Sequence, residues 1–246
     1  MKTNPMMRLL AENKGKGKFE IKAQADNPRE AVVYLYDAIV STEYEADWYG
    51  GVSAESFVKQ INALDVDTIK LRINSPGGSV FAARAMETAL RNHKAKVIAY
   101  IDGLAASAAS FLAMVADEIE MAQGSFFMIH KAWTVVWGDA DEMLKATKLL
   151  EKLDGTLATT YHNRTGIDES ELLQMMAAET WMEASEAVAK GFADRVVSDN
   201  KTAENHWQLG AYNHAPAVPT NQVAAPEPQP DRAALRRSAM VAIAGA

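Results

Sequence analysis

The stretch IDGLAASAASFLAMVAD (residues 101–117) decides the fold, because it joins an apolar strand to an apolar helix through residues that are almost all small. The strand is predicted over AKVIAYI (95–101), and the helix over AASAASFLAMVA (105–116). Small residues let two backbones approach closely, and they also leave space around a hydroxyl. The pattern places Ser107 in the first turn of this helix, where free N–H groups and the positive end of the helix dipole converge.

Two interpretations of this serine remain open on the residues alone. Close packing of a buried helix explains the small residues without any chemistry, and Ser110, one turn deeper, is expected to bond back to a backbone carbonyl. A nucleophilic serine needs the same free space for a tetrahedral intermediate. The spacing differs from the G-x-S-x-G turn of α/β-hydrolases.

Strands and helices alternate on both sides of this stretch, which predicts an α/β fold with a mainly parallel sheet and right-handed crossovers. We expect one domain over residues 18–200. Residues 1–17 are expected to be flexible, and residues 201–246 to form a Pro/Ala-rich tail with a short terminal helix in AALRRSAMVAIAGA (233–246). Further strands are predicted at 31–40, 68–74, 126–130 and 193–197, and further helices at 53–64, 80–93, 139–164, 168–179 and 184–191.

Composition excludes several classes of function. The chain has 246 residues and a net charge of −7, which argues against nucleic acid as a partner. Because it contains no cysteine, disulfides, thiolate catalysis and cysteine-based zinc sites are excluded. No apolar run is long enough for a signal peptide or a membrane span, so we expect no membrane partner and a cytoplasmic location. No cofactor and no metal are expected.

A glycine pair follows the predicted strand at 68–74, in the sequence NSPGGS (74–79). Gly77 and Gly78 allow unusual backbone angles and leave amide N–H groups free near a helix N-terminus, which suits a negatively charged oxygen. An ordinary strand-to-helix turn explains the same residues. The loop lacks the GK[ST] of a phosphate-binding loop, so nucleotide binding is not expected and any dependence on ATP requires a partner.

One of the five histidines lies where a general base for the serine is expected. His130 closes the apolar strand SFFMIH (125–130), directly after the serine helix, and a neutral imidazole can accept a hydroxyl proton. A purely structural histidine stays possible. The other four lie at polar helix ends or in and beside the tail: His93, His162, His206 and His214. The pattern does not select the acidic group that orients the imidazole.

Four segments together resemble the Clp protease proteolytic subunit (ClpP) family, and within it the head-maturation proteases of tailed phages and prophages. They are INSPGGSV, DGLAASAASFLA, FMIH and TGIDESELLQMMAAETWMEASEAVAKGFAD, and the similarity covers about residues 18–199. The resemblance implies a ClpP/crotonase-like fold with a protruding handle helix, here over residues 139–164. The leucine side of that helix, with Leu150, Leu153, Leu157 and Tyr161, is either an oligomer contact or part of the core.

The resemblance implies a serine endopeptidase with a Ser-His-acid triad. Its nucleophile corresponds to Ser107, its base to His130 and its acid to Glu179, where ClpP proper has Asp. Asp168 and Asp194 are alternatives for the acid. The implied oxyanion donors are the N–H groups of Gly78 and Ala108, and the implied substrate-binding edge comprises Gly77, Gly78, Ser79 and Val80.

The resemblance also implies partners. Subunits would assemble into homo-oligomeric rings, heptameric or stacked in pairs, and an ATPase partner is one option. In the phage branch the substrates would be scaffold or capsid proteins, cleaved in the host cytoplasm or inside the immature capsid. Alternatives are a crotonase-fold acyl-CoA enzyme, a Ser-Lys signal-peptide peptidase-like enzyme, and a non-catalytic capsid assembly or scaffold protein that retains a protease domain.

Overall fold

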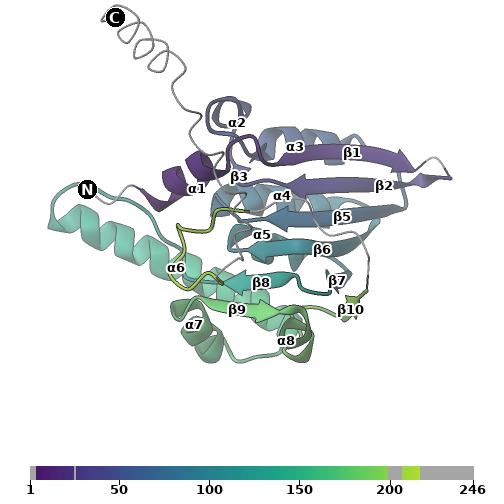
Figure 1. The fold of residues 1–246 in the computed structure, drawn as a ribbon. Coiled ribbons are helices and arrows are strands. Elements are labelled where there is room, and N and C mark those ends of the chain that lie inside the picture. Colours follow the sequence, from purple (N-terminus) through teal and green to yellow (C-terminus); the bar gives the residue numbers. More distant parts are fainter. Residues whose placement is uncertain (1–3, 25, 199–206, 217–246) are drawn as a thin grey trace, which may run out of the picture. The chain divides into compact units, whose positions relative to one another are not determined.

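An eight-stranded sheet forms the frame of the molecule (Figure 1). The computed structural model describes residues 4–24, 26–198 and 207–216. The main path of the sheet has the order β1-β2-β5-β6-β7-β10, and β8 joins it by pairing with β6 and with β9. The strands are β1 (Lys18–Gln24), β2 (Asn27–Tyr36), β5 (Thr68–Ser75), β6 (Lys96–Ala106), β7 (Glu118–Ala122), β8 (Phe126–Ile129), β9 (Thr180–Glu183) and β10 (Arg195–Val197).

The sheet is mainly parallel, as the alternation of strands and helices predicts. The β1–β2 and β8–β9 pairs are antiparallel, and the other pairs of this sheet are parallel. The strand β6 is long enough to serve two neighbours on one side. Its residues 98–101 pair with β7, and its residues 104–106 pair with β8. The sheet therefore divides into two branches on this side of β6, one continuing through β7 and the other through β8. The pairing with β8 ends immediately before Ser107.

The helices α3 (Ala54–Asn62), α4 (Val80–Asn92) and α5 (Ala108–Ala113) lie together on one face of this sheet (Figure 1). Side chains alternate along a strand, so neighbouring residues of β6 belong to different cores. Ala105 faces the large core with α4 and α5, whereas Leu104 and Ala106 face a smaller cluster on the other side. The remaining elements are α1 (Pro5–Asn13), β3 (Ile39–Val40), α2 (Glu43–Tyr49), β4 (Val52–Ser53), α6 (Ala140–Thr165), α7 (Glu169–Ala177) and α8 (Ala184–Ala189).

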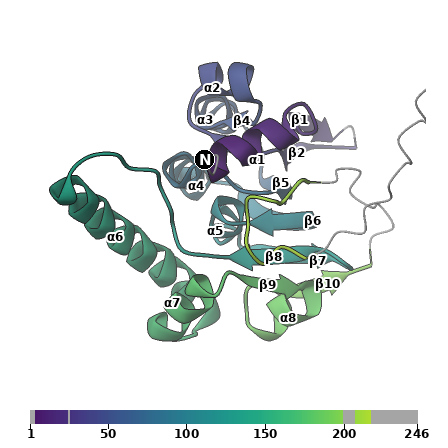
Figure 2. The same ribbon diagram turned by 60° about the vertical axis from the view of Figure 1, so that its left-hand side comes forward.

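The long helix α6 forms close to the predicted range and stands out from the body of the molecule (Figure 2). Its C-terminal half packs into the core through Leu157 and Tyr161, which are buried. Its N-terminal half leaves Leu144 59% exposed and Leu149 49% exposed. Of the leucine side predicted from the sequence, Leu157 and Tyr161 thus belong to the core, whereas Leu150 and Leu153 are half-buried.

The N-terminal segment differs from its prediction, because residues 5–13 form α1 instead of a flexible chain. The Asn4 side chain accepts hydrogen bonds from the first turn, and Pro5 suits the first helical position. Leu9 and Leu10 are buried, being 2% and 5% exposed, so the packing of these side chains stabilises the helix in addition to its N-cap. The short length of the helix and the NKGKGK stretch (13–18) that follows it conceal the helix in the sequence.

The serine stretch also differs from its prediction. The strand β6 continues to Ala106, beyond Asp102 and Gly103, and α5 begins only at Ala108. Asp102 is accommodated inside the sheet because it accepts hydrogen bonds from Arg72 on β5 and from Tyr36 on β2. Ser107 is therefore the turn residue between strand and helix, and it does not lie in the first helical turn.

Part of the tail is also structured. Residues 207–216 lie across the ends of β5, β6 and β8, where a loose chain is predicted. The predicted terminal helix lies outside the described residues.

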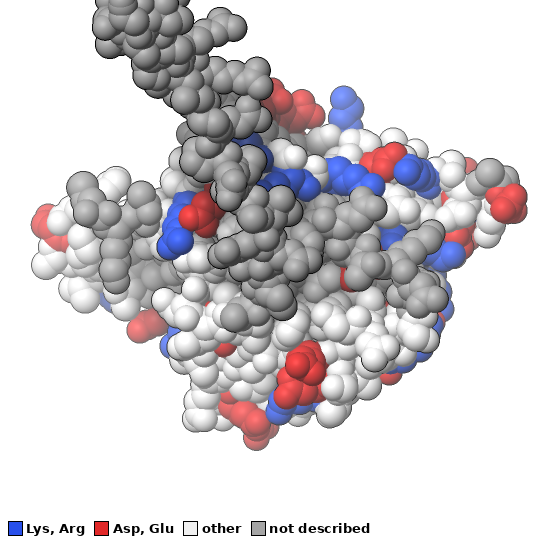
Figure 3. Space-filling view, viewed as in Figure 1, with Lys and Arg blue, Asp and Glu red and all other residues white. Residues whose placement is uncertain are grey.

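Acidic and basic side chains alternate on the face seen in Figure 3, between wide areas of other residues. Within the described ranges, no helix is long and apolar enough to cross a membrane.

Candidate active site

Ser107 occupies a strained position at the end of β6. Its backbone has φ 55° and ψ −123°, a conformation that only glycine adopts without cost. Its N–H donates to the carbonyl of Met128 on β8 at 2.9 Å, which holds the turn against the sheet. The Ser107 side chain makes no capping bond to α5, although it stands at the N-cap position. The hydroxyl is therefore available to another group.

That group is His130, which lies directly after β8. Its Nε2 atom is 2.7 Å from the Ser107 Oγ atom. The parallel pairing of β6 with β8 brings these two residues together, because both stand just beyond the carboxyl ends of paired strands. Burial lowers the pKa of His130 to about 4, although the nearby Glu179 charge opposes this shift. At neutral pH the imidazole is therefore uncharged and can accept the serine proton.

Glu179 lies in the turn between α7 and β9, with φ 53° and a side chain that is 8% exposed overall. One carboxylate oxygen accepts from the N–H of His214 at 2.7 Å, and the other accepts from the N–H of Asn213 at 3.0 Å. The indole of Trp181 donates to the same group at 3.2 Å. Burial alone would raise the pKa of Glu179, but these donors and His130 hold it below its usual value. Its carboxylate thus stays ionised beside the imidazole.

Glu179 acts on His130 through its charge; within the described residues no hydrogen bond joins the two side chains. The alternative acids have other partners or positions. The Asp194 carboxylate accepts from the N–H of Ile119 at 2.6 Å and from Arg164 at 2.5 Å. Asp168 stands at the N-cap of α7. Of the three carboxylates considered from the sequence, Glu179 is the one that shifts the pKa of His130.

The glycine pair forms a tight loop between β5 and α4, and its backbone is fixed against β3. The N–H of Ile39 donates to Gly77 at 2.8 Å, and the N–H of Ser79 donates to Ile39 at 2.9 Å. A Cβ atom at Gly78 would lie 2.1 Å from the Ile39 carbonyl oxygen. A Cβ atom at Gly77 would lie 2.5 Å from the carbonyl oxygen of Ala106. Both positions need glycine for space as well as for their positive φ.

Two backbone N–H groups remain free near the serine. Gly78 stands between the two residues that bond to Ile39, so its own N–H points away from β3. Ala108 is the first residue of α5, where a helix leaves its N–H groups without internal partners. In the part of the chain that the structure describes, neither N–H donates an intramolecular hydrogen bond. Such donors suit an oxygen that gains negative charge.

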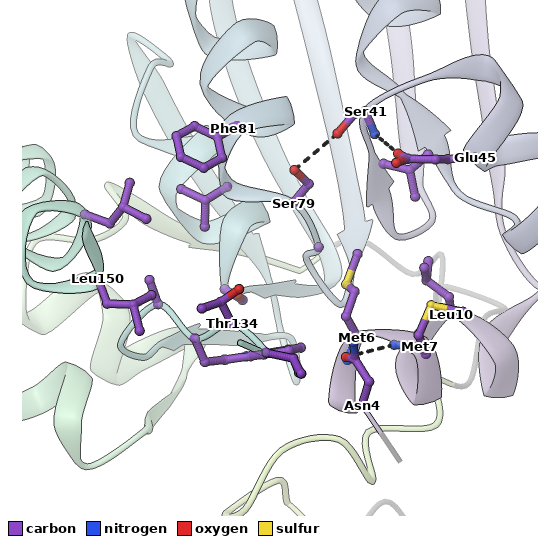
Figure 4. A pocket seen from close by; sticks show the side chains of 18 of the residues that line it. Asn4, Met6, Met7, Leu10, Ser41, Glu45, Ser79, Phe81, Thr134 and Leu150 are labelled. Carbon is purple, nitrogen blue, oxygen red and sulfur yellow. Dashed lines mark hydrogen bonds between the residues drawn. The ribbon is translucent and has the colours of Figure 1, made fainter. Parts of the chain in front are cut away.

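A cavity of about 430 Å³ opens onto Ser107 and His130. Figure 4 shows many of the side chains that line it, among them Met6, Ser79, Phe81 and Leu150. Gly78, Ser79 and Val80 line it, and Gly77, the fourth residue of the predicted substrate-binding edge, is not among its lining residues. Much of the remaining lining is apolar and comes from distant segments, namely α1 with Met6, Met7 and Leu10, and α6 with Leu149, Leu150 and Leu153. The polar residues Asn4, Ser41, Glu45 and Thr134 also line the cavity. An extended apolar segment of a ligand fits this chemistry.

Ser110 plays the part predicted for it. Its hydroxyl donates to the carbonyl of Ser107 at 2.7 Å and lies 2.9 Å from the Tyr161 hydroxyl of α6. It therefore links the first turn of the short helix α5 to α6.

Across the described ranges, no group of three or more His, Cys, Asp or Glu side chains is arranged to hold a metal ion.

The Clp protease family model matches residues 35–200, which is more than half of the chain. The chain belongs to the Clp protease family. It is 32% identical over 158 residues to the ATP-dependent Clp protease proteolytic subunit of Deinococcus radiodurans, which covers 62% of this chain and 76% of the relative. It is 28% identical over 199 residues to the ATP-dependent Clp protease proteolytic subunit 1 of a Synechococcus species, covering 78% and 95%.

Sequence reasoning missed three residues of this Clp-family chain, all in the predicted tail. Trp207 is 6% exposed, and its indole donates to Asn74 at the end of β5 at 2.9 Å. The Tyr212 ring contacts the His130 ring edge-on, with 5.4 Å between centroids. Asn213 donates to Glu179. The available signal was the presence of two large aromatic residues in WQLGAYNHA (207–215), a stretch otherwise poor in core residues.

Proposed function

We propose that this chain is a serine endopeptidase of the ClpP type. Membership of the Clp protease family supports a peptidase hydrolase. The observation that carries the proposal is the contact of 2.7 Å between the Ser107 hydroxyl and the His130 imidazole. Two free N–H groups, of Gly78 and Ala108, stand beside it. A nucleophile, a base and an oxyanion site are the three parts that acyl transfer requires.

In the proposed reaction, the Ser107 oxygen attacks a peptide carbonyl while His130 Nε2 takes the hydroxyl proton. The N–H groups of Gly78 and Ala108 stabilise the oxyanion, and one such donor contributes roughly 3 kcal/mol to the barrier reduction. The imidazolium then gives its proton to the leaving amine, and the C–N bond breaks. Water, activated by the same imidazole, hydrolyses the acyl-enzyme and restores the serine.

Glu179 has the role of the acidic member in this proposal. Its ionised carboxylate favours the imidazolium that forms during the attack, because it raises the pKa of the histidine. It also favours the tautomer with the proton on Nδ1, which leaves Nε2 free to accept from Ser107. Movement of the carboxylate toward Nδ1 when substrate binds would add a direct hydrogen bond.

The substrate would bind as an extended strand along Gly77–Val80, with side chains in the apolar cavity. Main-chain pairing of this kind gives weak sequence preference, so control of access would determine which proteins are cut. Rings of identical subunits provide such control. The exposed apolar residues of α6 and of the preceding loop support an oligomer contact there: Leu144, Leu149, Val135 and Trp137.

The proposed biological role is maturation of a phage prohead, by cleavage of scaffold or capsid proteins. The resemblance of the four sequence segments to the phage branch supports this role. Incubation with the scaffold protein from the same genomic neighbourhood tests it. Products that form with the native chain but not with Ser107→Ala are expected, and an intact scaffold would restrict the proposal to the peptidase activity.

The Ser107–His130 pair favours a peptidase over an acyl-CoA hydratase or isomerase of related fold, because those enzymes need the oxyanion site but no serine–histidine pair. A fluorophosphonate probe tests the choice directly. It should label the native chain on Ser107, and Ser107→Ala should remain unlabelled while it keeps the native oligomeric state. Labelling that persists in Ser107→Ala would remove this serine from its role, and failure to label the native chain would contradict the peptidase proposal.

A further inference from the structure

The segment of residues 207–214 contacts three parts of the candidate active site, namely the glycine loop, His130 and Glu179. Figures 1 and 2 show it in yellow-green, passing from the end of β5 toward β8 and β9. Trp207 anchors it in the small cluster formed with Leu104, Ala106 and Met128. Asn13 of α1 fixes the next residue, because its side chain donates to the Gln208 carbonyl at 2.9 Å and accepts from the Gln208 N–H at 2.8 Å.

Tyr212 joins two functional parts of the site. Its hydroxyl donates to the carbonyl of Pro76, in the loop that presents the Gly78 N–H. Its ring lies edge-on against His130 and against Trp181, with interplanar angles of 86° and 77°. Burial raises the pKa of the Tyr212 phenol well above its usual value, so it remains a neutral donor. One side chain thus fixes both the oxyanion loop and the imidazole plane.

The next two residues hold the acid. The N–H groups of Asn213 and His214 donate to the two oxygens of Glu179 at 3.0 and 2.7 Å. Backbone donors favour the charged form of a carboxylate, so they keep it ionised where burial alone would neutralise it. Their positions follow directly from that of Tyr212, because the three residues are consecutive.

The segment leaves the substrate cavity open. Of the residues that line the cavity beside Ser107, none belongs to the described residues 207–216. A segment that blocked substrate would instead occupy the space in front of Gly78 and Ser79. The contacts go instead to the histidine ring and to the Pro76 carbonyl of the glycine loop, as expected for a support of the site.

We propose that residues 207–214 are an integral support of the active site, with Tyr212 as a positioning residue for His130 and for the loop of Gly78. This inference rests on the proposed peptidase function and adds a fourth element to it. The segment acts by preorganisation: it fixes the base, the acid and an oxyanion donor before substrate arrives.

The pKa of His130 depends on the charged groups near it and on how far water is excluded from its ring. A change in this pKa can therefore show whether the segment is in place. Glu179 is the carboxylate that acts on it, and Lys131, the next residue, directs its ammonium toward Asp154 at 4.0 Å. Tyr212 and Trp181 add no charge but exclude water. Removal of the Tyr212 ring should admit water, which raises the pKa of the histidine from about 4 toward its ordinary 6.5.

The experiment uses the full chain with Tyr212→Phe and Tyr212→Ala, and with Tyr36→Phe as the control. Tyr36 also donates a phenol hydrogen bond, to Asp102 at 2.5 Å, outside the candidate site. Peptide hydrolysis is measured from pH 4 to 9, and the His130 ring protons are titrated by NMR. Tyr212→Ala should lower kcat/KM by about 10- to 100-fold and move the acid limb upward by at least one pH unit. Tyr212→Phe should lower kcat about 3- to 10-fold without moving the limb, because the ring remains.

A native rate and a native histidine titration in Tyr212→Ala would overturn the proposal, and so would a rate that rises, since that would make the segment an inhibitor. If Tyr212→Ala melts below the assay temperature, the kcat of Tyr212→Phe decides the question. A loss of about 3- to 10-fold with a native His130 titration supports the proposal, and a native kcat overturns it. A native chain that no fluorophosphonate labels refutes the peptidase function. The NMR titration of the two variants then still tests whether Tyr212 positions His130.

Discussion

Two serines stand at equivalent places in this fold and do different work. Ser79 and Ser107 each precede a helix that follows a parallel strand, α4 after β5 and α5 after β6. Ser79 has an ordinary extended backbone, with φ −67°, and its hydroxyl accepts from the N–H of Ala82 at 3.3 Å. Ser107 has φ 55°, makes no such bond, and its hydroxyl meets His130.

The difference shows what frees a hydroxyl at a helix N-terminus. In the turn after β5 the unusual backbone angles fall on Gly77 and Gly78, so the serine that follows them relaxes into a cap. In the turn after β6 the strain falls on the serine itself. Its side chain then makes no bond to the helix, and the N–H of Ala108 has no partner among the described residues. Under the proposed function, the first turn supplies a backbone donor, and the second supplies both a donor and a nucleophile.

The largest effect on kcat is expected from a change that displaces the turn after β5. Gly78→Ala should lower kcat by about 10²- to 10³-fold, because the new Cβ would lie 2.1 Å from the Ile39 carbonyl oxygen and would displace the N–H that faces the substrate. Steady-state peptide hydrolysis measures it.

The matched control for this change is Gly124→Ala. Gly124 also has a positive φ, of 83°, but a Cβ there meets nothing within 4 Å. This variant should lose about 1 kcal/mol of stability and keep the native kcat. Equal loss of kcat in both variants would show that backbone strain, and not the position of the Gly78 donor, limits the reaction.

A second test uses pH, because only the Ser107 hydroxyl is coupled to a titrating group. Catalysis requires the neutral imidazole, so kcat/KM should stay near its plateau as the pH falls and decline only near the His130 pKa of about 4. The free energy of unfolding should decrease between about pH 6.5 and pH 4, because the unfolded chain binds the proton first.

His130→Asn serves as the control for the stability measurement, since it should lose this part of the pH dependence. If kcat/KM instead declined near pH 6.5, the imidazole would be exposed to water. That result would contradict the buried contact between His130 and the Ser107 hydroxyl.

The smallest effects are expected on stability, and they should have opposite signs for the two serines. Ser79→Ala should cost about 1 kcal/mol through the lost cap, as should Ser53→Ala at the N-terminus of α3, where Ser53 accepts from Ser56 at 3.0 Å. Ser107→Gly should raise stability by about 1 kcal/mol, because relief of backbone strain exceeds the entropy cost of glycine. Thermal and urea unfolding measure all three, and a loss of stability in Ser107→Gly would contradict the assignment of strain.

The alternation of strands and helices in the sequence was enough to predict the parallel sheet and the long helix α6. It placed Ser107 in the first turn of a helix and His130 at the end of the next predicted strand. The structure puts Ser107 before that helix and brings the two residues into contact. The sequence pattern failed at the end of β6, because Asp102 and Gly103 look like the close of a strand. Ion pairing with Arg72, a residue on another strand, keeps the strand intact.

The contacts of residues 207–214 with the site could not be predicted from the sequence either, because they too involve residues far away in the chain. The cavity that receives Trp207 is made by β6 and β8, about a hundred residues earlier in the chain. The hydrogen bonds to Glu179 come from backbone N–H groups, which every residue but proline has. The two aromatic residues of this stretch signalled that it could be buried, but local composition did not show which elements it contacts.

The forked strand has a consequence for how activity is lost on heating. Ser107 follows a strand whose last residues are hydrogen-bonded to neighbours on both flanks. The proposed nucleophile thus directly follows a strand that is paired on both flanks, and it does not lie on a surface loop. Edge strands and the outer end of α6 can fray without disturbing it. Inactivation and global melting should accordingly occur together, as one cooperative event.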